Sequence, residues 1–210
     1  DVAPPIAVNR DEAPPAIRTK QIDGGLRWSI TKRLTLVGSV FQIEKPYYGL
    51  DSNRYFRDLG EIRHRGAELS LAGSPAPGLS IVAGGLLLDA EATGQQVDAG
   101  LVGRHPVGSS PGTYIASIDY RPPALKVISV DANLSHNAHR VVSIDDRVAL
   151  PDRTLLDLGM RYHFSVARKP AVFRLQATNV LNTFSWDIAG SSALQTHSPR
   201  QVTGRITVDI

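Results

Sequence analysis

The connections between the strand-like segments of this chain alternate regularly in length. Short polar turns alternate along the chain with long irregular connections, the turns at 31–33, 73–78, 122–124 and 165–170 and the long connections at 46–54, 93–111, 138–152 and 183–199. In an antiparallel sheet this order puts all short connections at one end and all long ones at the other. A soluble sandwich has no need for that arrangement, whereas a barrel that crosses an outer membrane has short turns on one side and longer loops on the other.

Nine segments have the composition expected of β-strands. Alternation of apolar and polar residues is clear in the segments 21–30, 125–135, 155–164, 173–178 and 202–210 and noisier in 34–45, 55–72, 79–92 and 112–121. A period of two indicates a strand with one apolar and one polar face. No stretch approaches the roughly 20 apolar residues that a membrane helix needs. A membrane protein without such a helix crosses as a closed barrel, because lipid offers no partners for free backbone groups.

The two predicted faces differ in charge. The apolar faces of the clear strands carry no charged residue, whereas the opposite faces carry both signs, on Arg27, Glu68, Asp131, Asp157, Arg161, Arg174, Arg205 and Asp209. Aromatic residues flank the short connections at Trp28, Tyr120, Tyr162, Phe164 and Phe173 and, more sparsely, the long ones at Phe41, Tyr114, Phe184 and Trp186. Such girdles mark the two interfaces of a membrane barrel. The alternative is a soluble β-sandwich that serves as a binding or adhesion module, with its apolar faces buried against each other.

Strand parity bears on how much of a barrel this chain forms. Nine crossings leave the two chain ends on opposite sides of the membrane, whereas complete single-chain bacterial barrels normally have an even count. We therefore expect an all-β antiparallel meander of about nine strands, a partial transmembrane β-barrel in the form of a curved open sheet, with further strands before Asp1. Parity disfavours a small self-contained barrel. Residues 1–16, with Pro4-Pro5 and Pro14-Pro15, are expected to form an irregular extracellular segment, and residues 17–210 the barrel part.

Several functional classes find little support in the sequence. The chain of 210 residues has no cysteine, which excludes disulfides and thiolate metal sites, and its net charge of +3 is not gathered into basic runs that would bind nucleic acid. Nothing in the sequence orders a Ser–His pair of the kind that a hydrolase needs, so we do not expect an enzyme. His136 and His139 precede Asp145-Asp146, which makes a loop metal site conceivable, but solvated loop side chains are the preferred interpretation. No metal and no cofactor is expected.

Short motifs in a fixed order resemble a known family. They are Val2-Ala-Pro4 followed by Asn9, Pro15, Lys20-Gln21 and Gly25-Leu-Arg27; the run from Leu59 to Ser70 with its Gly-x-x-x-x-x-Gly-x-Glu spacing; Leu88-Asp-Ala-Glu91; Asn179-Val-Leu-Asn182 with Phe184 and Trp186 behind it; and the closing strand from Pro199 to Asp209. Together they resemble the C-terminal barrel region of TonB-dependent outer-membrane receptors, in particular those for ferric siderophores. The chain departs from that pattern at Ile210, where such barrels usually end in Phe.

The resemblance implies a function. It implies a barrel of about 22 strands filled by an N-terminal plug, of which this chain would supply fewer than half the strands and neither the plug nor a TonB box. The implied activity is uptake of a ferric siderophore across the outer membrane of a Gram-negative bacterium, driven by the inner-membrane TonB complex, with outer-membrane lipid as the surroundings. For the ligand, which offers aromatic or anionic surface, the best candidates on the long loops are Tyr47, Tyr48, Arg54 and Trp186.

Overall fold

The structure, a computed structural model, describes residues 3–13, 16–189 and 193–209. Val2, Pro14, Pro15 and Ile210, which the sequence interpretation used, lie outside the described residues. In the described part, residues 3–13 and 16–19 contain no strand. The predicted boundary between residues 16 and 17 stays a prediction.

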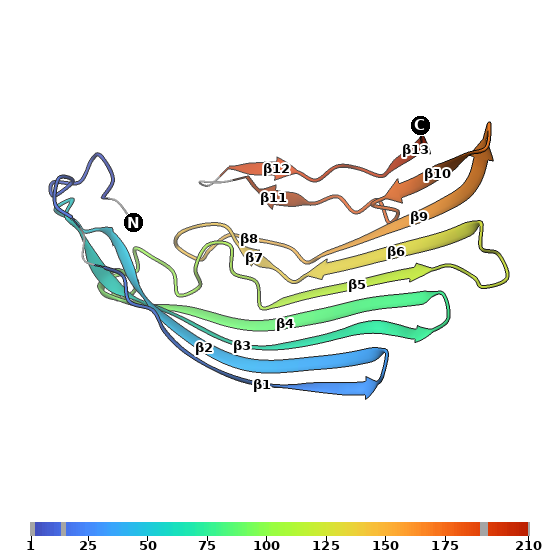
Figure 1. The fold of residues 1–210 in the computed structure, drawn as a ribbon. Helices are drawn as coiled ribbons and strands as arrows, with labels where there is room; N and C mark the ends of the chain where they lie inside the picture. Colours follow the sequence, from blue (N-terminus) through green and yellow to red (C-terminus); the bar gives the residue numbers. More distant parts are fainter. Residues whose placement is uncertain (1–2, 14–15, 190–192, 210) are drawn as a thin grey trace.

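The chain forms a nine-stranded antiparallel sheet with the order β1-β2-β3-β4-β5-β6-β9-β10-β13 (Figure 1). Its strands are β1 (Lys20–Thr31), β2 (Leu34–Leu50), β3 (Phe56–Ala76), β4 (Leu79–Gly94), β5 (Gly112–Tyr120), β6 (Ile128–Asn137), β9 (Arg153–Val166), β10 (Lys169–Thr178) and β13 (Gln201–Val208). The long connections add a short helix and two hairpins, namely α1 (Gln95–Asp98), β7 (Arg140–Val141) with β8 (Ala149–Leu150), and β11 (Trp186–Ile188) with β12 (Leu194–Thr196). All nine predicted strands are confirmed.

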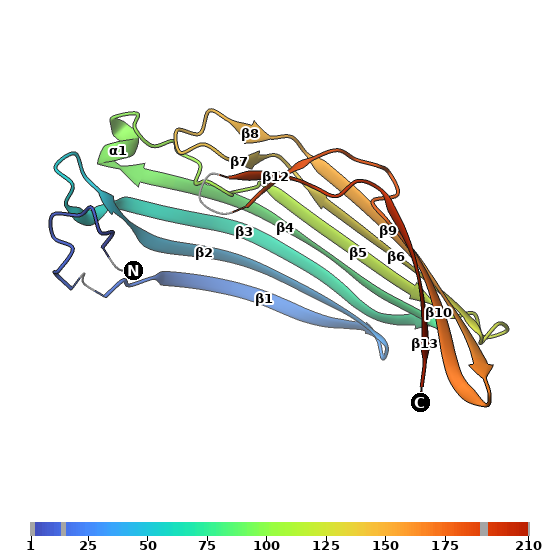
Figure 2. The ribbon, with the colours of Figure 1, turned by 90° about the horizontal axis from the view of Figure 1, so that it is seen from above.

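The turns between paired strands explain the meander locally. Ala167 and Arg168, which join β9 to β10, both have positive φ, at 49° and 66°. A two-residue hairpin with φ above zero at both positions matches the twist of its strands. Gly78, between β3 and β4, has φ 76°, and a side chain there would collide with the carbonyl of Arg121. These short turns lie at one end of the sheet and the long connections at the other (Figures 1 and 2), as the sequence predicts.

Several strand ends differ from the prediction, among them the end of β2 and the start of β6. β2 continues to Leu50 because residues 46–50 pair with β3, so the predicted loop at 46–54 shortens to residues 51–55. β6 begins at Ile128 and not at Leu125, because Pro122 and Leu125 accept backbone hydrogen bonds of 3.0 and 2.9 Å that form two successive turns. Proline has no N–H to donate to a sheet ladder. The strand pairing therefore stops at Pro122-Pro123, and the turns follow directly.

The sheet curves into a trough (Figures 1 and 2). Its strand register gathers apolar side chains on the convex face and charged ones on the concave face. The strand register puts the predicted apolar faces together: Ile118 lies opposite Ala132, which lies opposite Leu158. These side chains are not covered: Val130 is 43%, Leu158 42%, Ile206 64% and Trp28 58% exposed. Among the described residues, no large side chain is fully buried. The soluble sandwich is therefore wrong, because the described residues form one large sheet whose apolar face has nothing packed on it.

The apolar face ends at a polar row on the loop side. Gln42, Arg65 and Asp89 lie directly opposite one another across β2, β3 and β4. These three strands are 17, 21 and 16 residues long, so they extend beyond the roughly 9–11 residues that cross a bilayer. The other end of the apolar face carries the predicted aromatic residues, including Tyr162 and Phe164, whose rings stack at 5.7 Å.

One aromatic residue was assigned to the wrong face. Phe41 lies opposite Asp23 and Gly66, on the charged concave face. Its ring covers Gly66, where any side chain would collide with it. Phe41 therefore fills space inside the trough and does not belong to an outer aromatic girdle.

The edges of the sheet are open in the described residues: β1 and β13 do not pair with each other. The self-contained barrel is thereby wrong for the described part of the chain. Within the same residues, no helix has the length and apolar character needed to span a membrane.

Candidate functional site

The N-terminal segment and the long connections gather at one end of the trough (Figure 2). Tyr47 and Tyr48 lie there, at the end of β2. The register shifts between them, since Tyr47 lies opposite Gly60 and Tyr48 opposite Asp58, which leaves Leu59 as an extra residue on β3. A bulge of this kind re-aims neighbouring side chains. The ring of Tyr48 lies 5.8 Å from that of Phe56.

The connection between β2 and β3 is held from two sides. The side-chain amide of Asn9 donates to the carbonyl of Phe56 at 2.9 Å and accepts from the Phe56 N–H at 2.8 Å. Arg54, at φ 62°, accepts a hydrogen bond of 2.9 Å from the N–H of Val8 through its carbonyl. On the other side, Gln96 of α1 donates to the carbonyl of Leu50 at 2.8 Å. Tyr47 and Tyr48, at the end of β2, and Arg54, in the loop that follows, therefore lie in an ordered region.

Trp186 lies on a different connection, the one between β10 and β13 (Figures 1 and 2). Its ring meets that of Phe184 edge-on, with centroids 5.8 Å apart. The structure thus places Tyr47 and Tyr48 at the end of β2 and Arg54 in the loop that follows, whereas Trp186 lies on another connection at the same end of the sheet. Whether these four residues contact a ligand stays a prediction.

Asp187 holds two long connections together. Its carboxylate accepts hydrogen bonds from Arg140 at 3.0 Å and Arg153 at 2.5 Å, and its second oxygen lies 3.2 Å from Nδ1 of His197. Arg140 also donates to the carbonyl of Trp186 at 3.2 Å. Burial acts to raise the pKa of Asp187, but the hydrogen bonds from the two guanidinium groups outweigh it and hold that pKa below its usual range. The carboxylate is therefore an ionised anchor that positions Trp186.

The β4–β5 and β6–β9 connections form one unit. The N–H of Gly103 donates to Ile144 and that of Gly108 to Val141, both at 2.8 Å. His105 contacts the carboxylate of Asp146 across the two connections. Between them lies a polar cavity of about 390 Å³, lined in part by His105, His139, Ser109, Ser110 and Asp146.

The conceivable metal site does not assemble. Nδ1 of His136 lies 2.8 Å from the hydroxyl of Thr154, and its ring lies 5.8 Å from that of Tyr114, whereas His139 lines the cavity. In the described part of the chain, no three His, Asp or Glu side chains converge as metal ligands.

The concave wall carries a network of ion pairs. Arg161 pairs with Asp119 and, at 3.5 Å, with Asp131. Arg174 pairs with the other oxygen of Asp131 at 3.4 Å. Asn133 accepts a hydrogen bond of 2.8 Å from Ser117 on the same face. Such a surface suits water or a polar occupant.

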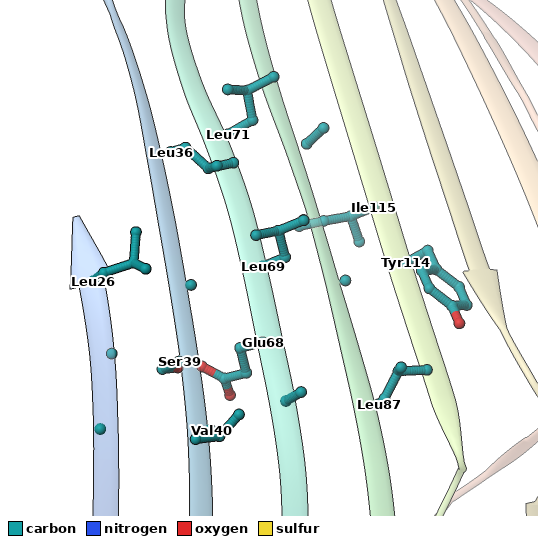
Figure 3. A pocket seen from close by; sticks show the side chains of 17 residues that line it. Leu26, Leu36, Ser39, Val40, Glu68, Leu69, Leu71, Leu87, Tyr114 and Ile115 are labelled. Carbon is teal, nitrogen blue, oxygen red and sulfur yellow. The ribbon is translucent and has the colours of Figure 1, made fainter. Parts of the chain in front are cut away.

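The convex face is hollowed over β1 to β5, as Figure 3 shows. Small residues leave this groove of about 880 Å³ between the larger side chains Leu26, Leu36, Leu69, Leu71 and Leu87, with Gly24, Gly38, Ala67, Ala83 and Gly85 among its lining. Its walls are almost wholly apolar, with Ser39, Glu68 and Tyr114 as the polar residues of the lining, so it suits hydrocarbon chains better than a metal chelate.

With this geometry in view, the chain can be compared with known proteins. Residues 9–182 match the family model described as TonB dependent receptor-like, beta-barrel. The chain belongs to this family. It is similar to the ferrichrome receptor FcuA of Yersinia enterocolitica, with 24% identity over 205 residues, 96% of this chain and 27% of that protein.

Two solved receptor structures share the same sheet. The ferric preacinetobactin receptor BauA of Acinetobacter baumannii matches 100% of this chain with a TM-score of 0.83 and 27% identity. The ferric-catecholate import receptor Fiu of E. coli K12 matches 98% of it with a TM-score of 0.72 and 17% identity, which shows the fold alone. The chain spans only 32% and 29% of these two structures.

The receptor motif Asn179-Val-Leu-Asn182 has a structural role at the end of β10. Asn179 is 2% exposed and has φ 48°. Its side chain donates to the carbonyls of Thr183 and Ser198 at 3.0 and 3.1 Å and accepts from the N–H of Thr183 at 2.9 Å. Asparagine tolerates this left-handed conformation better than most residues. It therefore ends the strand and ties the β10–β13 connection to its own base.

Sequence reasoning missed the residues that order the loop end. Asn9 was noted only as part of the family pattern, and Asp187 was not singled out at all. Single charged or amide residues in loops give no periodic signal, so their partners are not visible in the sequence. The motif around Asn179 was the only local sign that the β10–β13 connection is structured.

Proposed function

We propose that this chain forms part of the wall of an outer-membrane receptor of a Gram-negative bacterium that imports a ferric siderophore with energy from the TonB complex. Membership of the TonB-dependent receptor family supports this. Similar proteins named for ferrichrome and ferric preacinetobactin also support it. The family is a class of transport receptors and not of enzymes.

The observation that carries the proposal is the division of the sheet into two faces. Val130, Leu158 and Ile206 are about half exposed on the convex side, where only lipid would cover them without cost. The ion pairs of Arg161 and Arg174 line the opposite side, where water or a polar occupant would lie. A sheet of this kind separates hydrocarbon from an aqueous path, as an import receptor requires.

We place the first contact with the ferric siderophore at the loop end. Tyr47 and Tyr48 stand at a bulge at the end of β2, beside the loop that Asn9 holds in place, and Trp186 stands on a connection that Asp187 anchors. Aromatic rings on ordered loops supply contact area at low entropic cost. Arg54 is exposed and offers a cation to an anionic chelate.

The test uses the receptor as its gene encodes it, expressed in a Gram-negative strain deprived of its own siderophore receptors. Uptake of radioactive iron is measured with hydroxamate, catecholate and mixed ferric siderophores, with and without a working TonB. We expect uptake of at least one chelate, abolished without TonB. Failure of every chelate, or uptake that does not need TonB, contradicts the proposal.

A variant pair tests the binding residues. Tyr48→Ala should weaken binding to energy-depleted cells by about tenfold, the effect of about 1.4 kcal/mol. Tyr55→Ala is the matched control, since Tyr55 lies in the loop that follows β2 and is 45% exposed. Equal losses in the two variants would place the binding surface elsewhere.

A further inference from the structure

Three arginines face one another directly across neighbouring strands. Arg161 of β9 lies opposite Arg174 of β10, which lies opposite Arg205 of β13, all on the concave face. Directly opposite residues in a sheet have Cβ atoms roughly 4.5–5.5 Å apart, and like charges in such positions destabilise the pairing. This row of three, the arginine ladder, requires compensating negative charge.

The described residues compensate the ladder only in part. Asp119 and Asp131 are its partners, and they too lie directly opposite each other. Asp131 reaches across Gly159 to the arginines, and a side chain at Gly159 would collide with its carboxylate. Among the described residues, Arg205 forms no salt bridge, so three cations face two carboxylates.

Hydrogen bonding is also incomplete in this part of the wall. Nε of Arg161 and Oδ1 of Asp131 are buried and have no hydrogen-bond partner among the described residues. A buried donor or acceptor without a partner destabilises the fold. A cavity of about 290 Å³ lies beside these groups, lined in part by Asp119, Arg161 and Arg174.

We propose that the arginine ladder is a binding site for small multivalent anions that carry carboxylate or phosphate groups. Guanidinium groups bind such oxygens in bidentate geometry. Strands lie about 4.7–4.9 Å apart, so the three guanidinium groups can address two or three acidic groups of one molecule. The ladder lies on the concave wall, below the loop end, and is a second site distinct from the loop residues.

Its role in transport rests on the proposed function: the ladder selects anionic ferric chelates as they pass along the wall. The binding itself does not depend on transport. An anion in this site would lower the repulsion between Arg174 and Arg205, so its affinity should fall with added salt.

The experiment titrates purified receptor, encoded by the whole gene and held in detergent, with tricarballylate by isothermal titration calorimetry. Tricarballylate carries three carboxylates, and its trimethyl ester serves as the uncharged probe. We expect saturable binding of the acid and none of the ester. Arg174→Gln and Arg205→Gln should each weaken binding about tenfold. Arg27→Gln, on the concave face of β1, should leave it unchanged.

A variant of opposite sign separates binding from folding. Asp119→Asn removes a competing carboxylate that is 47% exposed and should strengthen tricarballylate binding about threefold. A ladder filled by a carboxylate from elsewhere in the polypeptide would give no binding in the parent protein and would overturn the proposal. Equal losses of tricarballylate affinity in Arg174→Gln and Arg27→Gln would also overturn the proposal. Tricarballylate binding without any siderophore uptake would support the anion site and contradict the proposed transport function.

Discussion

Replacing one of two isoleucines on β5 by arginine tests which face of the sheet meets lipid. Ile118 is 47% exposed on the convex face, beside Ile81 and Ala132. Ile115 is 52% exposed on the concave face of the same strand. Arginine on the lipid face of a membrane barrel costs about 2–4 kcal/mol at the bilayer midplane. At a water-facing surface a substitution usually changes stability by no more than about 0.5 kcal/mol.

Ile118→Arg should therefore destabilise the receptor by about 2 kcal/mol more than Ile115→Arg, a factor of roughly 30 in the folding equilibrium constant. The measurement is reversible folding of the receptor into lipid vesicles, titrated with guanidinium chloride and followed by tryptophan fluorescence. Residue type and strand are matched and the exposures are similar, so the face is the main difference besides three residues of depth along the strand. Equal costs for the two variants, or a larger cost for Ile115→Arg, would refute the assignment of the convex face to lipid.

Three further predictions concern single side chains. Asn9→Ala removes both hydrogen bonds to Phe56 and should speed amide exchange of Phe56 about tenfold, the effect of about 1.4 kcal/mol. Unchanged exchange would show that these two hydrogen bonds do not stabilise the loop. The pKa of Asp187 is lowered in the folded protein, so its ionised carboxylate should stabilise the loops at pH values above the usual aspartate pKa range. This stabilisation should be lost as the pH falls through the lowered pKa, and amide exchange in the β10–β13 connection should then become faster. Asp187→Asn should abolish this pH dependence. Gly159→Ala should displace the carboxylate that crosses it and lower the stability by about 1–3 kcal/mol, measured by the same vesicle titration; no change would mean that the carboxylate finds an equivalent position.

Local signals in the sequence were enough for the strands but not for their ends. The period of two over Leu155 to Phe164 arises within one strand, so it is readable without any knowledge of its neighbours. The end of β2 at Leu50 depends on pairing with β3, and that pairing has no local signature around Pro46. Phe41 was assigned to the outer girdle for the same reason: its segment alternates poorly, and only the register with Asp23 and Gly66 fixes its face.

The candidate site was predictable only in its location. Long connections at one end of a meander told where a ligand would be met, and the tyrosines at 47 and 48 were visible as aromatic residues near such a connection. The residues that hold this region in place were not visible in the sequence, because Asn9 and Phe56 are 47 residues apart in the chain. The contact of Asp187 with Arg140 spans the same number of positions.

By itself the sequence determined that this chain is a nine-stranded meander with one apolar and one charged face, because alternation along a strand is a property of neighbouring residues. Tertiary structure alone decided which charges meet. The arginine ladder exists only because the registers of β9, β10 and β13 bring Arg161, Arg174 and Arg205 to one level. A shift of one residue between two strands would send every side chain of the shifted strand to the opposite face, and register is fixed by hydrogen bonds between strands that no single segment encodes.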